Sequence, residues 1–210
     1  MAVLASLFFG ADVARADSLK ILALGDSLTA GYGLGPGDGF TDQLQDRFDK
    51  TYGVGEIVII NAGVSGDTTR GGLARLDWAL ADAPDLVMVA LGGNDMLRGL
   101  EPAETLSNLS QILETLQQQN KPVLLAGMLA AANMGQDYAS EFDSIYPQLA
   151  REYDVIFYPF FLDGVALNPD LNQPDGLHPN QKGVAIMVEK LWPYIEQLVK
   201  THQPVKKPKV

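Results

Sequence analysis

Cysteine is absent from this chain, and histidine occurs only twice among its 210 residues. Without a thiol the chain can use no cysteine nucleophile, form no disulfide and offer no thiolate to a metal ion. Two histidines are also too few for a metal centre built from several imidazole ligands. We therefore predict a site that uses no metal and no cofactor, in which hydroxyl, carboxyl, amide and imidazole groups carry the chemistry.

Positive charge is also scarce. The chain has 15 Lys and Arg residues against 26 Asp and Glu residues, which gives a formal net charge of −11. Nucleic-acid binding needs clustered Lys and Arg to neutralise phosphates, so no nucleic-acid partner is expected. The basic cluster VKKPKV closes a tail at residues 201–210, which we expect to be flexible; the alternative is a binding arm.

Long apolar runs are missing too, so we expect no stable membrane insertion. The run AVLASLFFGA near the start is too short to span a bilayer, and ARA at Ala14–Ala16 fits a small-x-small cleavage site. Residues 1–16 are therefore predicted to be a signal peptide, truncated at its start because the usual basic residues are missing. This predicts a periplasmic or secreted protein. The alternative is an apolar N-terminal helix on a cytoplasmic protein.

The rest of the chain has the composition of one globular domain, predicted at residues 17–200, with 47% apolar and 20% charged residues overall. Five apolar runs lack polar alternation, which is typical of strands buried on both faces. They are Leu19–Leu24, Glu56–Ile60, Asp85–Leu91, Pro122–Gly127 and Val155–Tyr158.

Helical patterns separate these runs. They cover Thr41–Thr51, Gly71–Ala81, Pro102–Asn120, Tyr138–Tyr153 and Gln181–Lys200, the last with a kink or split expected at Pro193. Alternating strands and helices predict an α/β fold of three α/β/α layers, flavodoxin-like, with a five-stranded parallel sheet and the first strand near its middle.

Polar, glycine-rich stretches lie between the predicted elements. GDSLTAGYG follows the first strand, NAGVSGDTT the second and GGNDMLRG the third, and DGLHPN precedes the last helix. In sheets of this kind, ligands bind outside the carboxyl ends of the strands. Ester hydrolysis by a serine needs a base, a group that orients the base, and donors for the oxyanion. The four stretches contain residues of each kind.

Ser27 is the only serine in the first stretch and is the candidate nucleophile. His178 is the candidate base by elimination, because His202 lies in the polar tail. Asp175 precedes His178 by three positions, so its carboxylate can reach the far nitrogen of the imidazole. Asn94 could aim a side-chain amide into the same crevice, and Gly66 could bring a backbone N–H close to it.

Each candidate also has an ordinary structural explanation. Ser27 or Asp26 can cap a helix, Asn94–Asp95 can form a turn, and residues 175–180 can be the turn and cap before the last helix. Gly66 can serve backbone geometry alone. We favour the chemical interpretation because separate loops each supply a different required part.

In order and spacing, the four stretches resemble the sequence blocks of the SGNH hydrolase superfamily, also called GDSL esterases and lipases. The resemblance is greatest to its arylesterase, thioesterase I and lysophospholipase L1 branch. It runs from about Leu19 to about Val199 and includes GLARL at Gly72–Leu76. It implies Ser27 as the nucleophile, Asp175 and His178 as the orienting carboxylate and base, and oxyanion donors from the backbone of Ser27 and Gly66 and the side chain of Asn94.

The same resemblance implies a small-molecule substrate, an acyl or aryl ester, an acyl thioester or a lysophospholipid. MLAAANMGQDY and FFLDGVALNPDL are apolar enough to line an acyl-binding cleft, or are ordinary packing beneath loops. We expect a monomer. Two alternatives remain: a metal-dependent phosphoesterase, which needs several His ligands, and a non-catalytic ligand-binding domain of the same fold.

Overall fold

A five-stranded parallel sheet forms the centre of the computed structural model, which describes residues 18–202. The strand order is β2-β1-β3-β4-β5, the flavodoxin-like order, so the predicted fold is confirmed. β1 lies second from one edge, and β3 is the central strand. The strands are β1 (Leu19–Gly25), β2 (Ile57–Gly63), β3 (Leu86–Ala90), β4 (Val123–Ala126) and β5 (Ile156–Tyr158).

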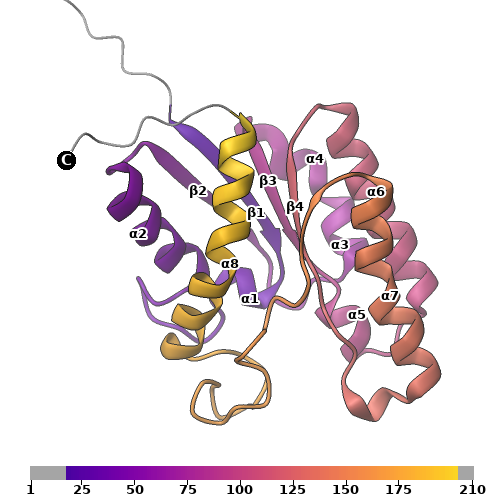
Figure 1. The fold of residues 1–210 in the computed structure, drawn as a ribbon. Coiled ribbons are helices and arrows are strands. Elements are labelled where there is room, and N and C mark those ends of the chain that lie inside the picture. Colours follow the sequence, from indigo (N-terminus) through magenta and orange to yellow (C-terminus); the bar gives the residue numbers. More distant parts are fainter. Residues whose placement is uncertain (1–17, 203–210) are drawn as a thin grey trace, which may run out of the picture.

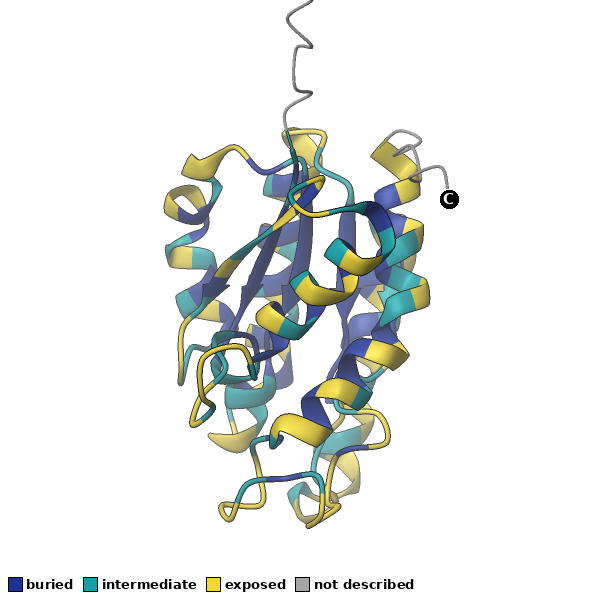
Figure 2. Cartoon of the chain, turned by 90° about the vertical axis from the view of Figure 1, so that its left-hand side faces the viewer, coloured by how far each residue is buried: buried dark blue, intermediate teal, exposed yellow. Residues whose placement is uncertain are grey.

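Helices cover both faces of the sheet (Figure 1). One face carries α2 (Phe40–Tyr52) and α8 (Gln181–His202), and the other carries α3 (Thr69–Ala74), α6 (Pro102–Gln118) and α7 (Gln136–Glu152). The central strands are dark blue in Figure 2, because side chains on both of their faces are buried. This double burial explains why their sequences lack polar alternation.

The predicted helix at Gly71–Ala81 is wrong as a single element. The chain forms α3, α4 (Leu76–Ala79) and a 3₁₀ turn at Leu80–Asp82, with a break at Arg75. Arg75 leaves the helical conformation, at φ −107° and ψ 7°, while its guanidinium bonds to Asp67 and to the carbonyl of Gly25. These contacts outweigh the weak helix preference of a segment that begins with two glycines.

Of the kink or split predicted at Pro193, the split is wrong, because α8 is continuous from Gln181 to His202, and the kink stays a prediction. Pro193 lies on the exposed side of the helix. Proline has no N–H, so the carbonyl one turn earlier lacks its usual helical donor. On this exposed side water can bond to that carbonyl, and the helix tolerates the proline. The helix includes Thr201 and His202, which the sequence assigned to the tail; residues 203–210 lie outside the described residues, as does the predicted signal peptide at residues 1–16.

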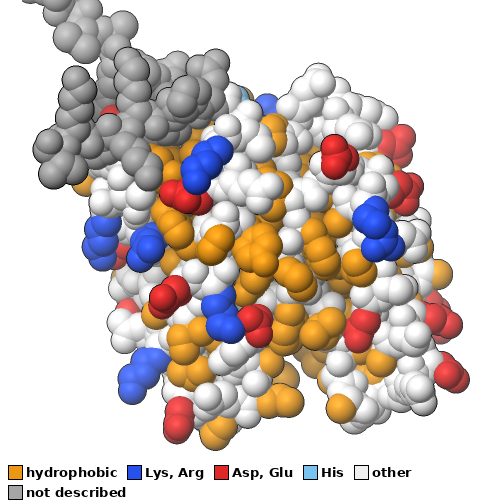
Figure 3. All heavy atoms as spheres, in the orientation of Figure 1, with side chains coloured by type: hydrophobic (Ala, Val, Ile, Leu, Met, Phe, Trp, Pro, Cys, Tyr) orange, Lys and Arg blue, Asp and Glu red, His pale blue; other side chains and the backbone are white. Residues whose placement is uncertain are grey.

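Side chains lie against both outer strands of the sheet. At the β2 edge, Gln45 donates its amide to the carbonyl of Ile57 and accepts the N–H of Ile59, both at 2.8 Å. At the other edge, Tyr194 of α8 packs on Tyr158 of β5, with ring centroids 4.9 Å apart. Figure 3, drawn in the orientation of Figure 1, shows apolar side chains gathered along the middle of the face turned to the viewer, between α8 and α7.

Short helices follow two of the strands and complete the described structure. α1 (Ser27–Ala30) begins directly after β1, and α5 (Gly93–Leu97) follows β3; a 3₁₀ turn at Ala132–Met134 follows β4. The sequence patterns did not predict them, since four or five residues are too few to show a period. No helix among residues 18–202 is long and apolar enough to cross a membrane.

Candidate active site

The first strand delivers Asp26 and Ser27 to the carboxyl end of the sheet. Asp26 is the N-cap of α1, and its Oδ1 accepts the N–H of Leu28 at 3.0 Å. Ser27 is the first residue of the helix, so its own N–H has no acceptor within the helix. The strand-to-helix junction therefore presents a hydroxyl and an unpaired backbone donor at the same point.

His178 bridges Ser27 and Asp175. Its Nε2 lies 2.9 Å from the Oγ of Ser27, and its Nδ1 lies 2.7 Å from the Oδ2 of Asp175. An ionised carboxylate can only accept, so Nδ1 carries the proton. Nε2 is then the acceptor for the serine hydroxyl, as a base must be.

Asp175 is held in place by its own loop. Its Oδ1 accepts the backbone N–H groups of His178 at 3.0 Å and of Leu177 at 2.9 Å. These two bonds, followed by the bond to the imidazole, lower the pKa of Asp175 to about 2. The carboxylate therefore stays ionised at any pH at which the imidazole can be neutral.

Contacts between the first and last loops hold the imidazole against α1. The ring of Tyr32 lies 4.6 Å from the ring of His178, centroid to centroid. Gln173 donates its amide to the carbonyl of Tyr32 at 2.8 Å and to that of Pro179 at 3.0 Å. Asn180 caps α8 by accepting the N–H groups of the next turn. Together these bonds fix the segment that carries Asp175 and His178.

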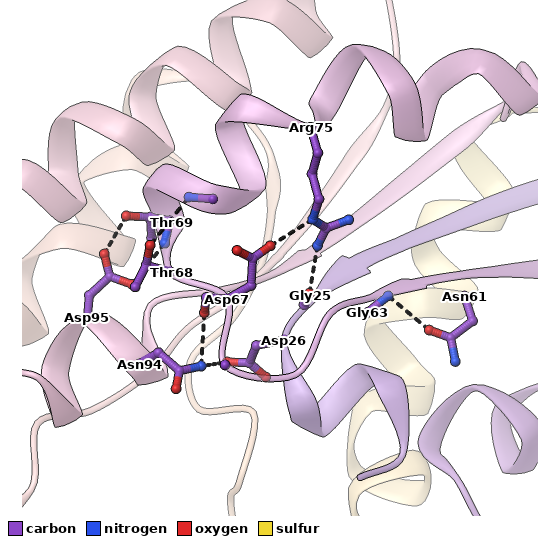
Figure 4. Close-up of polar contacts among 12 residues, drawn as sticks. Gly25, Asp26, Asn61, Gly63, Asp67, Thr68, Thr69, Arg75, Asn94 and Asp95 are labelled. Carbon is purple, nitrogen blue, oxygen red and sulfur yellow. Dashed lines mark hydrogen bonds and ion pairs between the residues drawn. The ribbon is translucent and has the colours of Figure 1, made fainter.

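Asn94 lies beside the same junction, close to Asp26 and Asp67 (Figure 4). The Asn94 amide nitrogen donates to the carbonyl of Asp67 at 2.9 Å and to the Oδ2 of Asp26 at 3.3 Å. Gly66, which precedes Asp67, adopts φ +81°, and its carbonyl accepts the guanidinium of Arg98 at 2.6 Å. The loops after β1, β2 and β3 thus converge where the sequence predicted.

Two buried carboxylates surround this point. Asp26 is 2% exposed; burial raises the pKa of Asp26 to about 6, although the Leu28 N–H and His178 act in the opposite direction. Asp95 is fully buried and accepts the N–H of Thr69 at 2.8 Å and its hydroxyl at 2.5 Å. The two bonds from Thr69 to Asp95 tie α5, which carries Asn94, to the start of α3.

The sequence profile of the GDSL-like Lipase/Acylhydrolase family matches residues 23–186, which include every one of these loops. The chain belongs to this family. It is 40% identical over 187 residues to "Thioesterase 1/protease 1/lysophospholipase L1" of Escherichia coli (strain K12), covering 89% of this chain and 86% of that protein. It is 40% identical over 174 residues to an arylesterase of Vibrio mimicus, covering 82% and 86%.

Solved structures of family members share the fold. The structure of TesA superposes with a TM-score of 0.80 at 37% identity, covering 85% of this chain and 99% of TesA. The SGNH-hydrolase family esterase AlinE4 gives a TM-score of 0.73 at 48% identity, covering 87% and 97%. The resemblance seen in the sequence is therefore confirmed, and the chain is an ester hydrolase of the GDSL family.

Structural explanations for the GDSL-family motifs prove to be partly right. Asp26 does cap a helix and Asn180 does cap α8, while Asn94–Asp95 form part of α5 and not a turn. The caps fix the loops that carry Ser27 and His178.

Sequence reasoning missed the roles of Asp67, Arg75 and Tyr32 around the site. Arg75 donates to the Oδ2 of Asp67 at 2.7 Å and to the carbonyl of Gly25 at 2.8 Å, which ties the loop after β2 to the end of β1. Arg75 lies within the GLARL stretch shared with the family, which was the available signal. Tyr32 lies within the GDSLTAGYG stretch, but its packing against His178 was not predicted. Within residues 18–202, no group of three or more His, Asp and Glu side chains is arranged to hold a metal ion.

Proposed function

We propose that the chain hydrolyses carboxylic esters through an acyl-enzyme formed on Ser27. The observation that carries the proposal is the unbroken row from Asp175 to His178 to Ser27, with contacts of 2.7 and 2.9 Å. A carboxylate, an imidazole and a hydroxyl bonded in this order are typical of nucleophilic catalysis by a serine.

In the first step, the Oγ of Ser27 attacks the ester carbonyl while Nε2 of His178 takes its proton. The imidazolium then gives that proton to the departing alcohol or thiol, which leaves the acyl group on Ser27. In the second half of the reaction, His178 removes a proton from water and the resulting hydroxide attacks the acyl carbonyl. The bond from the acyl carbon to the Oγ of Ser27 then breaks, the imidazolium returns its proton to that oxygen, and the acid is released. Asp175 keeps Nδ1 protonated and stabilises the imidazolium throughout.

Three N–H donors are available for the oxyanion. They are the backbone N–H groups of Ser27 and Gly66 and the side-chain amide of Asn94. The carbonyl of Gly66 is already occupied by Arg98, and the Asn94 amide is anchored on Asp67. Donors fixed before the reaction need no reorganisation as charge develops on the carbonyl oxygen.

The acyl group would lie on apolar side chains that the loops leave open. Tyr32 packs on His178, Leu177 precedes it, and Val64 donates its N–H to the carbonyl of Gly25 beside the nucleophile. Met128, after β4, approaches Gly93, so the MLAAANMGQDY segment borders α5. In FFLDGVALNPDL, by contrast, Phe161 and Val165 are fully buried. The large apolar side chains that are at least two-fifths exposed among the described residues are Tyr32, Val54, Val64, Trp78, Leu97, Leu129, Leu167 and Leu177. Of these, Tyr32, Val64, Leu97, Leu129 and Leu177 belong to the segments that follow β1 to β4 or that carry His178.

We therefore expect substrates with short or medium acyl chains, such as p-nitrophenyl esters. The relatives are named thioesterase, lysophospholipase, arylesterase and esterase, which is consistent with a site that tolerates several leaving groups. Which leaving group is preferred would be measured by comparing aryl, thioester and lysophospholipid substrates of one acyl chain.

A serine-reactive phosphonate provides the decisive experiment. One related structure is of esterase EstA from Pseudoalteromonas sp., 34% identical, inhibited by monoethylphosphonate. We expect the phosphonate to inactivate this chain and to be found by mass spectrometry on the peptide containing Ser27. Ser27→Ala should abolish both labelling and hydrolysis, while the control Ser144→Ala, on an exposed face of α7, should retain both. Hydrolysis by folded Ser27→Ala at the parent rate would disprove the proposal.

A further inference from the structure

Asp26 is adjacent to the nucleophile in sequence and touches a proposed oxyanion donor in space. Its Oδ2 lies 3.3 Å from the amide nitrogen of Asn94, across a sequence separation of 68 residues. We propose that Asp26 is a positioning residue that orients the Asn94 amide toward the oxyanion. The inference rests on the proposed serine mechanism and adds a residue to it.

The two partners of Asn94 decide which end of its amide faces the junction. The carbonyl of Asp67 can accept a hydrogen bond but cannot donate one, and the same is true of an ionised Asp26 carboxylate. Both therefore require the nitrogen of Asn94, and its amide oxygen must point away from them (Figure 4). Without Asp26, one acceptor alone would leave the amide plane free to tilt about its remaining bond.

The two bonds of Asn94 also differ in length. The bond to Asp67 is 2.9 Å and close to ideal, whereas the bond to Asp26 is 3.3 Å and correspondingly weak. The first can serve as a permanent anchor. The second occupies the other amide hydrogen only loosely, so a developing oxyanion next to Ser27 can take that hydrogen over at little cost.

Asp26 is itself immobile, as a positioning residue must be. Its Oδ1 is bonded to the N–H of Leu28, and the side chain is 2% exposed. A Cβ placed on Gly93 would lie 3.5 Å from its Oδ2, so the residue before Asn94 also packs close to this carboxylate. The carboxylate cannot swing away from Asn94 without losing its helix-capping bond.

Charged groups around Asp26 affect its ionisation. His178 on the last loop favours the carboxylate, Asp67 on the loop after β2 opposes it, and Asp26 in turn acts on the buried hydroxyl of Tyr146 from α7. A neutral side chain at position 26 would remove a negative charge near His178.

The test is a double-mutant cycle between Asp26→Asn and Asn94→Ala, assayed on a p-nitrophenyl ester. Asp26→Asn keeps an oxygen for the Leu28 cap but lets an amide replace the acceptor that faces Asn94. We expect kcat to fall about 10- to 100-fold with KM little changed, the size of effect that a small misplacement of a reacting group produces. In the Asn94→Ala background, Asp26→Asn should lower kcat by less than about threefold, because the amide that Asp26 orients is no longer there.

Losses that multiply in the double variant, or an unchanged kcat in Asp26→Asn, would overturn the proposal. Asp26→Ser, which can still cap α1 but is too short to reach Asn94, provides a second variant should Asp26→Asn fold poorly. Asp85→Asn is the matched control: this carboxylate accepts the N–H of Lys20 at 2.8 Å at the opposite end of the sheet, and kcat should not change. Phosphonate labelling of Ser27 in the parent protein tests the serine mechanism separately, so the two proposals can fail independently.

Discussion

At the scale of single residues, the imidazole of His178 is the group on which two others depend. Its Nε2 contacts the hydroxyl of Ser27, and its Nδ1 contacts the carboxylate of Asp175. We predict that His178→Ala lowers kcat about a thousandfold or more, because base and nucleophile act as one unit.

Asp175→Ala should cost less than His178→Ala, since packing against Tyr32 still holds the imidazole in part. The measurement is kcat on a p-nitrophenyl ester, with circular dichroism as the folding control. If both substitutions cost the same, Asp175 does more than orient the ring.

The buried carboxyl of Asp26 should make stability depend on pH in a specific direction. Its pKa is about 6 in the folded protein and 3.8 in the unfolded chain, so between these values the folded state binds more protons. Stability is therefore lost as pH rises through this window, by roughly 1 to 3 kcal/mol in total. Asp26→Asn has no proton to lose.

Urea unfolding of the parent and Asp26→Asn proteins would measure this effect. The free energy of unfolding of the variant, minus that of the parent, should increase from about pH 4 to about pH 7. Parallel curves would contradict the raised pKa. If Asp26→Asn also loses activity, as proposed above, this residue sacrifices stability for function.

At the scale of elements, α1 depends on a glycine in the neighbouring strand. A Cβ on Gly63, at the end of β2, would lie 2.3 Å from the backbone nitrogen of Ala30 and 2.7 Å from its Cα. These are backbone atoms of the helix that begins with Ser27, so they cannot move aside without moving Ser27, the proposed nucleophile.

We predict that Gly63→Ala destabilises the protein by about 2 kcal/mol or more and also lowers kcat. Gly35→Ala is the control, because a Cβ there meets only the Oδ2 of Asp38 at 3.3 Å, the end of a side chain that can rotate. Urea unfolding and kcat would be measured for both. A folded Gly63→Ala protein with parental activity would show that α1 can shift freely.

The longer elements were predictable from the sequence, and the exceptions have local causes. Strands buried on both faces can be recognised in the sequence as apolar runs, and α6 and α7 show a clear amphipathic period. The break at Arg75 could not be predicted, since it depends on partners in β1 and in the loop after β2. The continuity of α8 through Pro193 depends on which side of the helix faces solvent, which is a tertiary property.

The site was predictable to the extent that its chemistry is tied to residue type. A lone serine in the loop and one suitable histidine indicated Ser27 and His178, and the structure places them in contact. The Asn94 to Asp26 contact joins residues 68 positions apart and could not be inferred from either one. Capping explained Asp26 well enough from sequence alone that nothing prompted a second role.

At the scale of the whole molecule, the net charge of −11 should discriminate among substrates. Negatively charged substrates are repelled at low ionic strength, and salt screens that repulsion. We predict that KM for a thioester carrying phosphate groups falls several-fold when salt is raised from about 0.02 to about 0.5 M. KM for a neutral aryl ester of the same acyl chain should stay constant, and an equal response of both would contradict the prediction.

The distance along the chain between Ser27 and His178, 151 positions, has a consequence for biosynthesis. Asp175 and His178 find each other within one short segment, but the nucleophile emerges from the ribosome long before either is made. A nascent polypeptide thus stays inert until the segment before α8 has been translated and docked. On the proposed mechanism, a truncated translation product that lacks this segment cleaves no ester.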